Sequence, residues 1–420
     1  MSSVASGRGE ESFMKQIYLD HAATTPLNKL VLKKMMPYLQ EEYGNPSALY
    51  NLGRRSLKAV NEARKTVADI LASAPNEIIF TAGGTESDNL AVLGVARANR
   101  TAGNHIITTK IEHHAVLHAC KQLEKEGFVV TYLKPDKGGI ITAEQVIAAI
   151  KPETILVTIM YANNEIGTIE PIAEIGKALL KYNAAQRMGK QRVLFHTDAC
   201  QAAGTLDLNI NRLHTNLLTL NGSKIYGPKG IGVLYKKKDV KIQPLIFGGG
   251  QELGLRAGTE NVAGIVGLSE ALQLAQNDKE KENARLTTLR EYFWQELIKK
   301  IDNIKLNGHA EKRLPNNLNV SILNVEGEAM LLYMDEKGIQ AATGSACTSQ
   351  SLEPSHVLLS IGLPYEMAHG SLRFTLGHET TKADIDYVLK TLPEIVAKLR
   401  EISPVHLGLT DDGKKHPKYK

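Results

Sequence analysis

A lysine at the end of a predicted core strand is the first residue of this sequence whose position suits chemistry. Lys224 follows the apolar run TNLLTL, and the tight segment IYGPKG comes directly after it. A lysine at a strand end is most often a solvated charge, and glycine with proline usually marks a turn. A lysine held rigidly beside a ligand can instead form a Schiff base with a carbonyl compound. The rest of the chain decides between these two interpretations.

Small and acidic residues follow two further predicted strands. The segment EIIFTAGGTES places Gly84 and Thr85 between a strand and a helix, where backbone N–H groups and the helix start favour an anion such as phosphate. The segment VLFHTDACQ ends with Asp198 and, three residues later, Gln201. Each feature alone has an ordinary explanation, a steric turn in the first case and a helix cap in the second.

Histidines and an amide end two other predicted strands. Glu112, His113 and His114 follow HIITTKI, and Asn164 closely follows TILVTIMYA. The histidines can be packed, catalytic or metal-binding, and we predict no metal site because no carboxylate or cysteine cluster at ligand spacing accompanies them. Ligands of parallel α/β sheets bind at the carboxyl ends of the strands, so we expect all of these strand ends to meet in one crevice.

An anion seat, an acid, a histidine, an amide and a lysine together suit pyridoxal 5'-phosphate (PLP). This cofactor needs a lysine for its Schiff base, an acid opposite the pyridinium nitrogen and a cradle for its phosphate. Asp198 would keep the ring nitrogen protonated, because a cation and an anion close together favour each other's charged forms. The sequence therefore predicts a PLP site with Lys224 as the attachment point.

Cys347 and Arg373 lie outside these strands and raise a separate question. Cys347 is surrounded by small and polar residues in ATGSACTSQSLEPSH, which predicts a mobile loop rather than a core position. Cys120, in a predicted amphipathic helix, and Cys200, at a strand end, instead fit the usual buried cysteine. Arg373, in GSLRFTLG, can pair with a surface acid or form a two-pronged clamp on a substrate carboxylate.

The elements that must position these residues alternate between strands and helices from about residue 55 to 240. Near-continuous apolar strands between amphipathic helices predict an α/β fold with a mostly parallel sheet covered on both faces. We predict a disordered leader at 1–16, a segment at 17–29 that packs with the small domain, a large cofactor-binding domain at 30–272, a small domain at 273–405 and a flexible tail at 406–420.

Composition limits the class of protein. The 420-residue chain is 43% hydrophobic and 23% charged, as in soluble globular proteins, and its net charge of +5 is too scattered to indicate DNA binding. No apolar run is long enough to span a membrane, and the first residues lack the apolar core of a signal peptide. Three cysteines cannot form a disulfide framework in so long a chain, so a cytoplasmic protein is expected.

The motifs, taken together, resemble the cysteine desulfurases of the NifS/IscS type, which are fold-type I PLP enzymes of the class V aminotransferase group. The resemblance runs from YLDHAATTP to about ISPVHL and rests on YGNPSAL, GGTESDNLA, EHHAVL, NNEIGT, TDACQ, SKIYGPKG, GLRAGTENV and GSACTSQSLEPSHVL, in that order. It implies a seven-stranded sheet in the large domain, a smaller α+β C-terminal domain, L-cysteine as substrate, a homodimer, and a sulfur acceptor such as an iron–sulfur scaffold protein.

The resemblance also implies roles for individual residues. Lys224 would carry PLP, and His113 would stack on its ring and act as acid and base. Cys347, as a thiolate, would take the sulfur as a persulfide and leave alanine. The other implied contacts are Arg373 and Asn164 at the substrate, Asp198 at the pyridinium, Gln201 and Asn164 at the phenolic oxygen, Gly84 and Thr85 at the phosphate, and the partner subunit's Thr259 at the same phosphate.

One departure from the family pattern precedes the lysine. The family usually has Ser-Gly-His there, and both side chains help to bind phosphate; this chain has Asn221, Gly222 and Ser223. An amide and a hydroxyl would then replace a hydroxyl and an imidazole as hydrogen-bond donors.

Two other activities and one non-catalytic role remain as alternatives. A selenocysteine lyase fits the same motifs, whereas a class V aminotransferase needs no loop cysteine. A partner-binding scaffold without catalysis is disfavoured, because the chain holds every residue that the chemistry requires: Lys224, Asp198, His113, Cys347 and Arg373.

Overall fold

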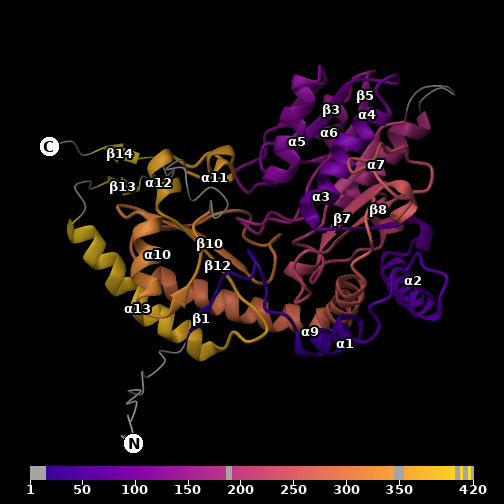
Figure 1. Cartoon of the computed structure of the whole chain (residues 1–420). Coiled ribbons are helices and arrows are strands. Elements are labelled where there is room, and N and C mark those ends of the chain that lie inside the picture. The colour runs from indigo at the N-terminus through magenta and orange to yellow at the C-terminus, as the bar shows by residue number, and fades with distance from the viewer. Residues whose placement is uncertain (1–15, 186–191, 345–353, 403–406, 410–414, 418–420) are drawn as a thin grey trace, which may run out of the picture.

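The protein folds into two units that lie side by side and share one long helix (Figure 1). This computed structural model describes residues 16–185, 192–344, 354–402, 407–409 and 415–417. The large unit surrounds a seven-stranded sheet and the small unit a three-stranded sheet, and helix α9 (Val262–Lys300) contributes to the hydrophobic core of each. Within the described residues, no helix has both the length and the apolar character that crossing a bilayer requires.

The large sheet confirms the predicted seven-stranded, mostly parallel arrangement. Its strands follow the spatial order β2 (Ile78–Thr81), β8 (Gly232–Lys236), β7 (Leu217–Asn221), β6 (Leu194–Asp198), β5 (Thr154–Thr158), β3 (His105–Thr109) and β4 (Val129–Leu133). Neighbouring strands are parallel except where β8 pairs antiparallel with β2 and β7. Only residues 222–231 connect β7 to β8, and so short a connection cannot return the chain for parallel pairing.

Helices cover both faces of this sheet, as the apolar strands predicted. They are α1 (Lys29–Gln40), α2 (Asn51–Leu71), α3 (Gly84–Asn89), α4 (Val95–Ala98), α5 (His114–Lys125), α6 (Ala143–Ala149), α7 (Ile172–Ala185) and α8 (Ile210–Leu213), with the π-helical turn η2 (Leu90–Gly94) joining α3 to α4.

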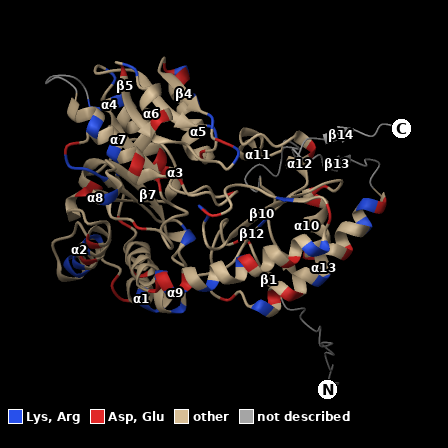
Figure 2. Cartoon of the chain, turned by 180° about the vertical axis from the view of Figure 1, so that it is seen from behind, with Lys and Arg blue, Asp and Glu red and all other residues tan. Residues whose placement is uncertain are grey.

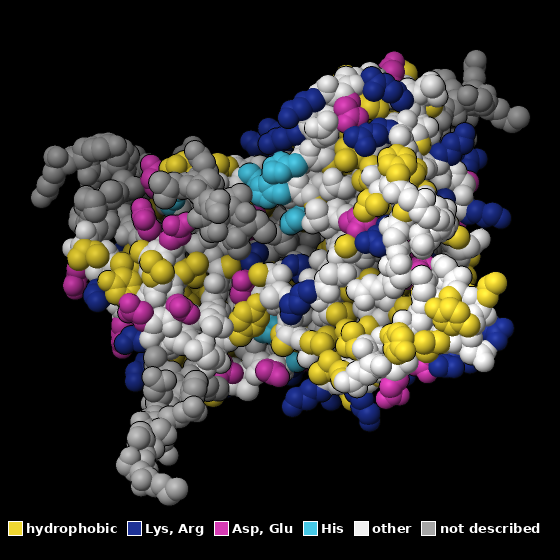
Figure 3. Space-filling model, in the orientation of Figure 1, with side chains coloured by type: hydrophobic (Ala, Val, Ile, Leu, Met, Phe, Trp, Pro, Cys, Tyr) yellow, Lys and Arg dark blue, Asp and Glu magenta, His cyan; other side chains and the backbone are white. Residues whose placement is uncertain are grey.

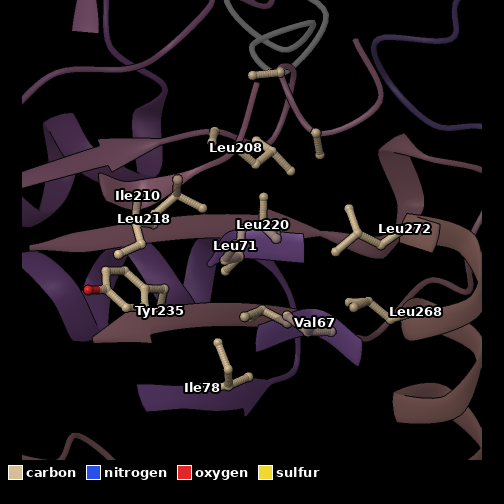
Figure 4. Close-up of a cluster of buried hydrophobic side chains, with 14 of the residues drawn as sticks. Val67, Leu71, Ile78, Leu208, Ile210, Leu218, Leu220, Tyr235, Leu268 and Leu272 are labelled. Atoms are coloured by element: carbon tan, nitrogen blue, oxygen red, sulfur yellow. The ribbon is translucent and has the colours of Figure 1, made fainter. Parts of the chain in front are cut away.

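Side chains on one strand alternate between two hydrophobic cores. Leu217 packs on the side of α3 to α5, whereas its neighbour Leu218 packs with Val67, Leu71 and Tyr235 on the other side, as Figure 4 shows for the second core. Both leucines are fully buried, and burying one leucine side chain contributes about 1.5–3 kcal/mol. The sheet is therefore a rigid platform whose strand ends keep fixed positions.

The small unit combines an antiparallel sheet with several helices of its own. The sheet order is β12 (Ser371–Thr375), β10 (Asn317–Ile322) and β9 (Ile304–Leu306), and the helices are α10 (Gly327–Asp335), α11 (His356–Ser360), α12 (Tyr365–His369) and α13 (Lys382–Ile402). A separate two-stranded ribbon pairs β13 (Leu407–Leu409) with β14 (Lys415–Pro417).

The N-terminal segment of the described chain belongs to the small unit by its pairing. Strand β1 (Ile17–Tyr18) lies parallel to β11 (Ile339–Gln340), and Asp20 then forms a bridge with Thr375 of β12. Beyond this bridge the segment runs on toward the carboxyl ends of the large sheet, where Thr25 N donates a hydrogen bond to Ser223 O at 2.9 Å. It therefore links the two sheets independently of α9.

Candidate active site

A cavity of about 250 Å³ opens at the carboxyl ends of the large sheet, between the two units. Nine of the predicted residues line it: Gly84, Thr85, His113, Asn164, Asp198, Gln201, Asn221, Lys224 and Arg373. Ser223 and Thr259 are not among the lining residues, and Cys347 lies outside the part of the chain that the structure describes.

Lys224 is held at the cavity by the backbone of the N-terminal segment. Its Nζ donates hydrogen bonds to the carbonyl oxygens of Ala22 at 2.8 Å and Ala23 at 2.5 Å. The turn that carries the lysine is fixed by Thr25, whose N–H and hydroxyl both donate to Ser223 O. The lysine is therefore not a solvated strand end, because backbone carbonyl groups fix its side chain and it lines the cavity.

The floor of the cavity holds carboxyl groups close together. Asp198 ends β6 and is 6% exposed, and its Oδ1 accepts a hydrogen bond from Cys200 N at 2.9 Å. Asp88 of α3 lines the same floor, and burial followed by the charge of Asp198 raises the pKa of Asp88 well above its usual value. Burial likewise raises the pKa of Glu112 to about 8. With a pKa of about 8, the carboxyl group of Glu112 is mostly neutral at pH 7.

His113 presents a neutral imidazole to the cavity. It caps the N-terminus of α5, where its Nδ1 accepts a hydrogen bond from Ala115 N at 3.1 Å. This bond assigns the proton of the neutral ring to Nε2. Burial lowers the pKa of His113, and the nearby carboxylate of Asp198 offsets that effect in part. A neutral ring with its proton on Nε2 can stack on an aromatic group and exchange that proton.

Further histidines border the mouth of the cavity, where Figure 3 shows them gathered between the two units. The ring of His114 lies 4.8 Å from that of His356 and 5.1 Å from that of His118, centroid to centroid. Burial lowers the pKa of His114 to about 4. Among the described residues, no group of three or more His, Cys, Asp or Glu side chains could hold a metal ion.

Arg373 is an almost fully buried guanidinium on β12 that already has a carboxylate partner. Its Nη2 donates to Asp20 Oδ1 at 2.7 Å and its Nη1 to Asn164 O at 3.0 Å, while the buried Nε has no hydrogen-bond partner among the described residues. The ion pair considered from the sequence therefore exists, with an acid of the N-terminal segment rather than of the surface. The YLDHAATTP motif contained this acid, but nothing in its spacing pointed to the arginine.

The turn after β2 approaches the floor so closely that only glycine fits. A Cβ on Gly84 would lie 2.7 Å from Cys200 Sγ and 3.4 Å from Asn221 Cβ. Cys200 is buried, as expected, yet it also lines the cavity. Ser223 donates its hydroxyl to Asn221 Oδ1 at 3.2 Å, so of these two substitutes it is Asn221 that faces the cavity.

The lining residues to which the sequence assigned no role include Asp88, Glu112, Glu165 and His356. Glu112 and Glu165 stand directly beside predicted residues in EHHAVL and NNEIGT, so the motifs contained them without indicating that their carboxyl groups are buried. Burial raises the pKa of Glu165 to about 7.

Known proteins with similar sequences were compared with this chain. Residues 17–388 match the aminotransferase class-V family. A protein named cysteine desulfurase IscS from Dictyoglomus turgidum is 51% identical over 390 residues, which cover 93% of this chain and 97% of that protein. Another of the same name from Methanosarcina thermophila is 52% identical over 391 residues, covering 93% and 94%. The chain belongs to the cysteine desulfurases of the class-V aminotransferase family.

Solved structures of similar proteins share the fold. A NifS-like protein has a TM-score of 0.85 at 34% identity and covers 91% of this chain and 100% of its own. A structure described as SspA in complex with cysteine has a TM-score of 0.75 at 38% identity and covers 86% and 99%. The family resemblance and the fold class predicted from the motifs are both confirmed.

Proposed function

We propose that this cysteine desulfurase uses PLP to remove the sulfur of L-cysteine, with L-alanine as product and a persulfide on Cys347. The observation that carries the proposal is the convergence of Lys224, Asp198, His113 and Arg373 on one cavity. The relative described in complex with cysteine supports the choice of substrate.

The lining residues fit PLP in charge and shape. Lys224 would hold it covalently, Asp198 would face the pyridinium nitrogen, and Gln201 with Asn164 would bond the phenolic oxygen. Gly84, which leaves no room for a side chain, would let backbone N–H groups near Thr85 approach the phosphate, and Asn221 would add an amide donor. When bound, PLP would withdraw electrons from the α-carbon of the substrate and so make its α-proton acidic.

Lys224 and His113 then move protons. Lys224 Nζ donates hydrogen bonds to the carbonyl oxygens of Ala22 and Ala23, which hold it at the site. As a neutral amine, Nζ would take the α-proton of cysteine. His113, neutral with its proton on Nε2, can donate that proton to the product as it forms.

Arg373 and Cys347 complete the reaction. Arg373, with Asn164 beside it, binds the substrate carboxylate through donors that Asp20 does not occupy. The Cys347 thiolate attacks the sulfur of the substrate, so that an S–S bond forms as the C–S bond breaks. The electron pair of the broken bond stays with the carbon fragment, which takes up protons to become alanine.

A homodimer is part of the proposal. Thr259 is exposed on the single chain, so the phosphate contact implied for it requires a partner subunit. Figure 3 shows hydrophobic side chains gathered over the α1 and α2 side of the large unit. The exposed apolar residues there are Leu30, Leu32, Leu39, Tyr43, Leu49, Tyr50 and Leu57. Exposed apolar clusters of this kind mark interaction surfaces.

The proposed cellular role is sulfur supply in the cytoplasm, to an acceptor such as an iron–sulfur scaffold protein. DNA is not among the proposed partners, because Figure 2 shows Lys and Arg interspersed with Asp and Glu rather than gathered in one basic face.

The test is attachment and turnover in the same preparation. The holoenzyme is reduced with borohydride, digested and analysed by mass spectrometry, and we expect the cofactor on Lys224. Alanine and sulfide are measured after addition of L-cysteine and a thiol reductant. Cofactor on Lys229 would overturn the site, and absence of alanine from the parent protein would overturn the activity.

A further inference from the structure

Glu165 is a buried acid that the proposed chemistry does not use, although it lines the cavity. It is 5% exposed and lies two residues after Asn163, whose side-chain oxygen accepts hydrogen bonds from the N–H groups of Glu165 and Ile166 at 2.9 Å each. A carboxyl group buried at such a site needs a specific partner. The question is which group its carboxyl oxygens serve.

The carboxyl group of Glu165 meets one residue on each side of segment 345–353: Gly344, directly before it, and Ser355, two residues after its end. Glu165 Oε2 accepts a hydrogen bond from the hydroxyl of Ser355. A Cβ on Gly344 would lie 3.1 Å from the same Oε2 and 3.2 Å from Ser355 Cβ. Gly344 and Ser355 are therefore neighbours, although ten residues, Cys347 among them, separate them in the chain.

The chain on each side of segment 345–353 also forms hydrogen bonds that fix it beside residues lining the cavity. On one side, Ala342 exchanges backbone hydrogen bonds with Arg373, at 2.6 and 3.2 Å. On the other side, Ser355 caps α11, because its hydroxyl oxygen accepts from Val357 N at 3.1 Å and Leu358 N at 3.3 Å. The adjacent His356 makes a 3.0 Å hydrogen bond from its Nε2 to the carbonyl oxygen of Glu112.

Glu165 itself is fixed to both units of the protein. Its backbone follows β5 of the large sheet, and its carbonyl oxygen accepts hydrogen bonds from Asn317 Nδ2 and Asn319 Nδ2 of β10, at 3.1 Å each. An acid held by its backbone on both sides is a rigid anchor for whatever its side chain binds.

We propose that Glu165 is a positioning residue that holds Gly344 and Ser355 together at the cavity wall. It thereby fixes the two points between which the segment with Cys347 is attached. It acts through Ser355 and Gly344 and does not touch the substrate. The functional part of the inference rests on the proposed role of Cys347; the structural part does not.

Hydrogen exchange in the holoenzyme tests the structural part without reference to activity. The amides of Val357 and Leu358 report opening at Ser355, because their bonds to its hydroxyl must break before exchange. In Glu165→Ala, loss of a hydrogen bond to an acid predicts exchange at these amides faster by roughly 10- to 100-fold. Glu165→Gln keeps an oxygen acceptor and should restore most of the protection.

A double-mutant cycle separates this role from general destabilisation. If Glu165 acts through Ser355, adding Glu165→Ala to Ser355→Ala should change exchange much less than it does in the parent. The matched control is Glu170→Gln, which alters a buried acid five residues away that accepts from Ile141 N and does not line the cavity. It should leave Val357 and Leu358 unchanged.

Turnover tests the functional part. Glu165→Ala should lower kcat for alanine formation at least tenfold while cofactor retention and the cysteine-induced absorbance change persist, and Glu165→Gln should recover it. Unchanged exchange at Val357 and Leu358 in Glu165→Ala, or full additivity with Ser355→Ala, overturns the inference whatever the activity. Absence of alanine formation in the parent would instead reject the proposed function, and the exchange result would still stand.

Discussion

Replacing Gly84 by alanine tests whether the turn after β2 must lie against the cavity floor. The new Cβ would lie 2.7 Å from Cys200 Sγ. Non-bonded contacts between carbon atoms are favourable at about 3.5–4.0 Å, and sulfur is larger, so this contact demands a shift of roughly 1 Å. The shift would displace the start of α3, including Thr85, which is proposed to hold the phosphate of the cofactor.

The expected cost follows from overpacking a buried site. Extra carbon atoms in a well-packed region cost about 1–3 kcal/mol. If the cost falls on cofactor binding, Gly84→Ala retains PLP roughly 5- to 150-fold less tightly. The measurement is a titration of cofactor-free protein with PLP, followed by visible absorbance, together with the thermal midpoint of the cofactor-free form.

Cys200→Ala supplies the decisive comparison, because it removes the sulfur atom that the new methyl group would strike. The double variant should recover much of the loss, with a coupling of roughly 0.5–3 kcal/mol between the two sites. Gly204→Ala is the control, since its Cβ would meet only Ile225 Cγ2 at an ordinary 3.6 Å. Parent-like PLP affinity in Gly84→Ala, or a loss that Cys200→Ala does not relieve, refutes the reasoning.

Three further predictions concern other parts of the site. Cys347→Ser should leave the cysteine-induced absorbance change intact but stop alanine and persulfide formation, because a hydroxyl is far less acidic than a thiol with a pKa of about 8.5; near-normal alanine production would exclude Cys347 as the nucleophile. Asn221→Ala should weaken PLP retention more than Ser223→Ala, since Ser223 bonds to Asn221 rather than lining the cavity; the reverse order in a dialysis experiment contradicts this. Burial raises the pKa of Glu112 from 4.5 to about 8 and that of Glu165 to about 7, so the stability they confer is complete below pH 4.5 and is lost as pH rises through 7 and 8. Glu112→Gln should flatten this pH dependence of unfolding by a few kcal/mol, on the order of 4, and an unchanged slope between pH 5 and 9 would count against the burial argument.

Apolar strands and the polar residues that end them were readable from the sequence. The runs before Gly84, His113, Asp198 and Lys224 all became strands of one sheet, because strands that are buried on both faces have few alternatives. Parallel strands bring their carboxyl ends to one edge, which is why distant motifs meet in one cavity.

Two kinds of contact could not be predicted from the sequence: hydrogen bonds to backbone carbonyl groups, and pairings between very short strands that lie far apart in the chain. Lys224 rests on the carbonyl oxygens of Ala22 and Ala23, and a carbonyl oxygen has no sequence signature. Strand β1 has two residues, too few for any periodicity, and its partner β11 is far away in the chain. The roles of Asp20 and Glu165 could not be predicted for another reason. The sequence of a motif does not show whether an acid within it will be buried or which group it will face.

The pairing of β1 with β11 has a consequence for how the protein is made. All strands of the large sheet have been synthesised by residue 236. Strand β1, near the start of the chain, pairs with a strand that begins only at residue 339. At ordinary translation speeds the ribosome takes tens of seconds to synthesise the chain between β1 and β11. During this time the wall formed by Ala22 and Ala23 has no anchor in the small unit, so Lys224 emerges long before its surroundings are complete. Completion of the cavity is thereby tied to the near-finished chain, and truncated products should expose Lys224 without forming the cavity.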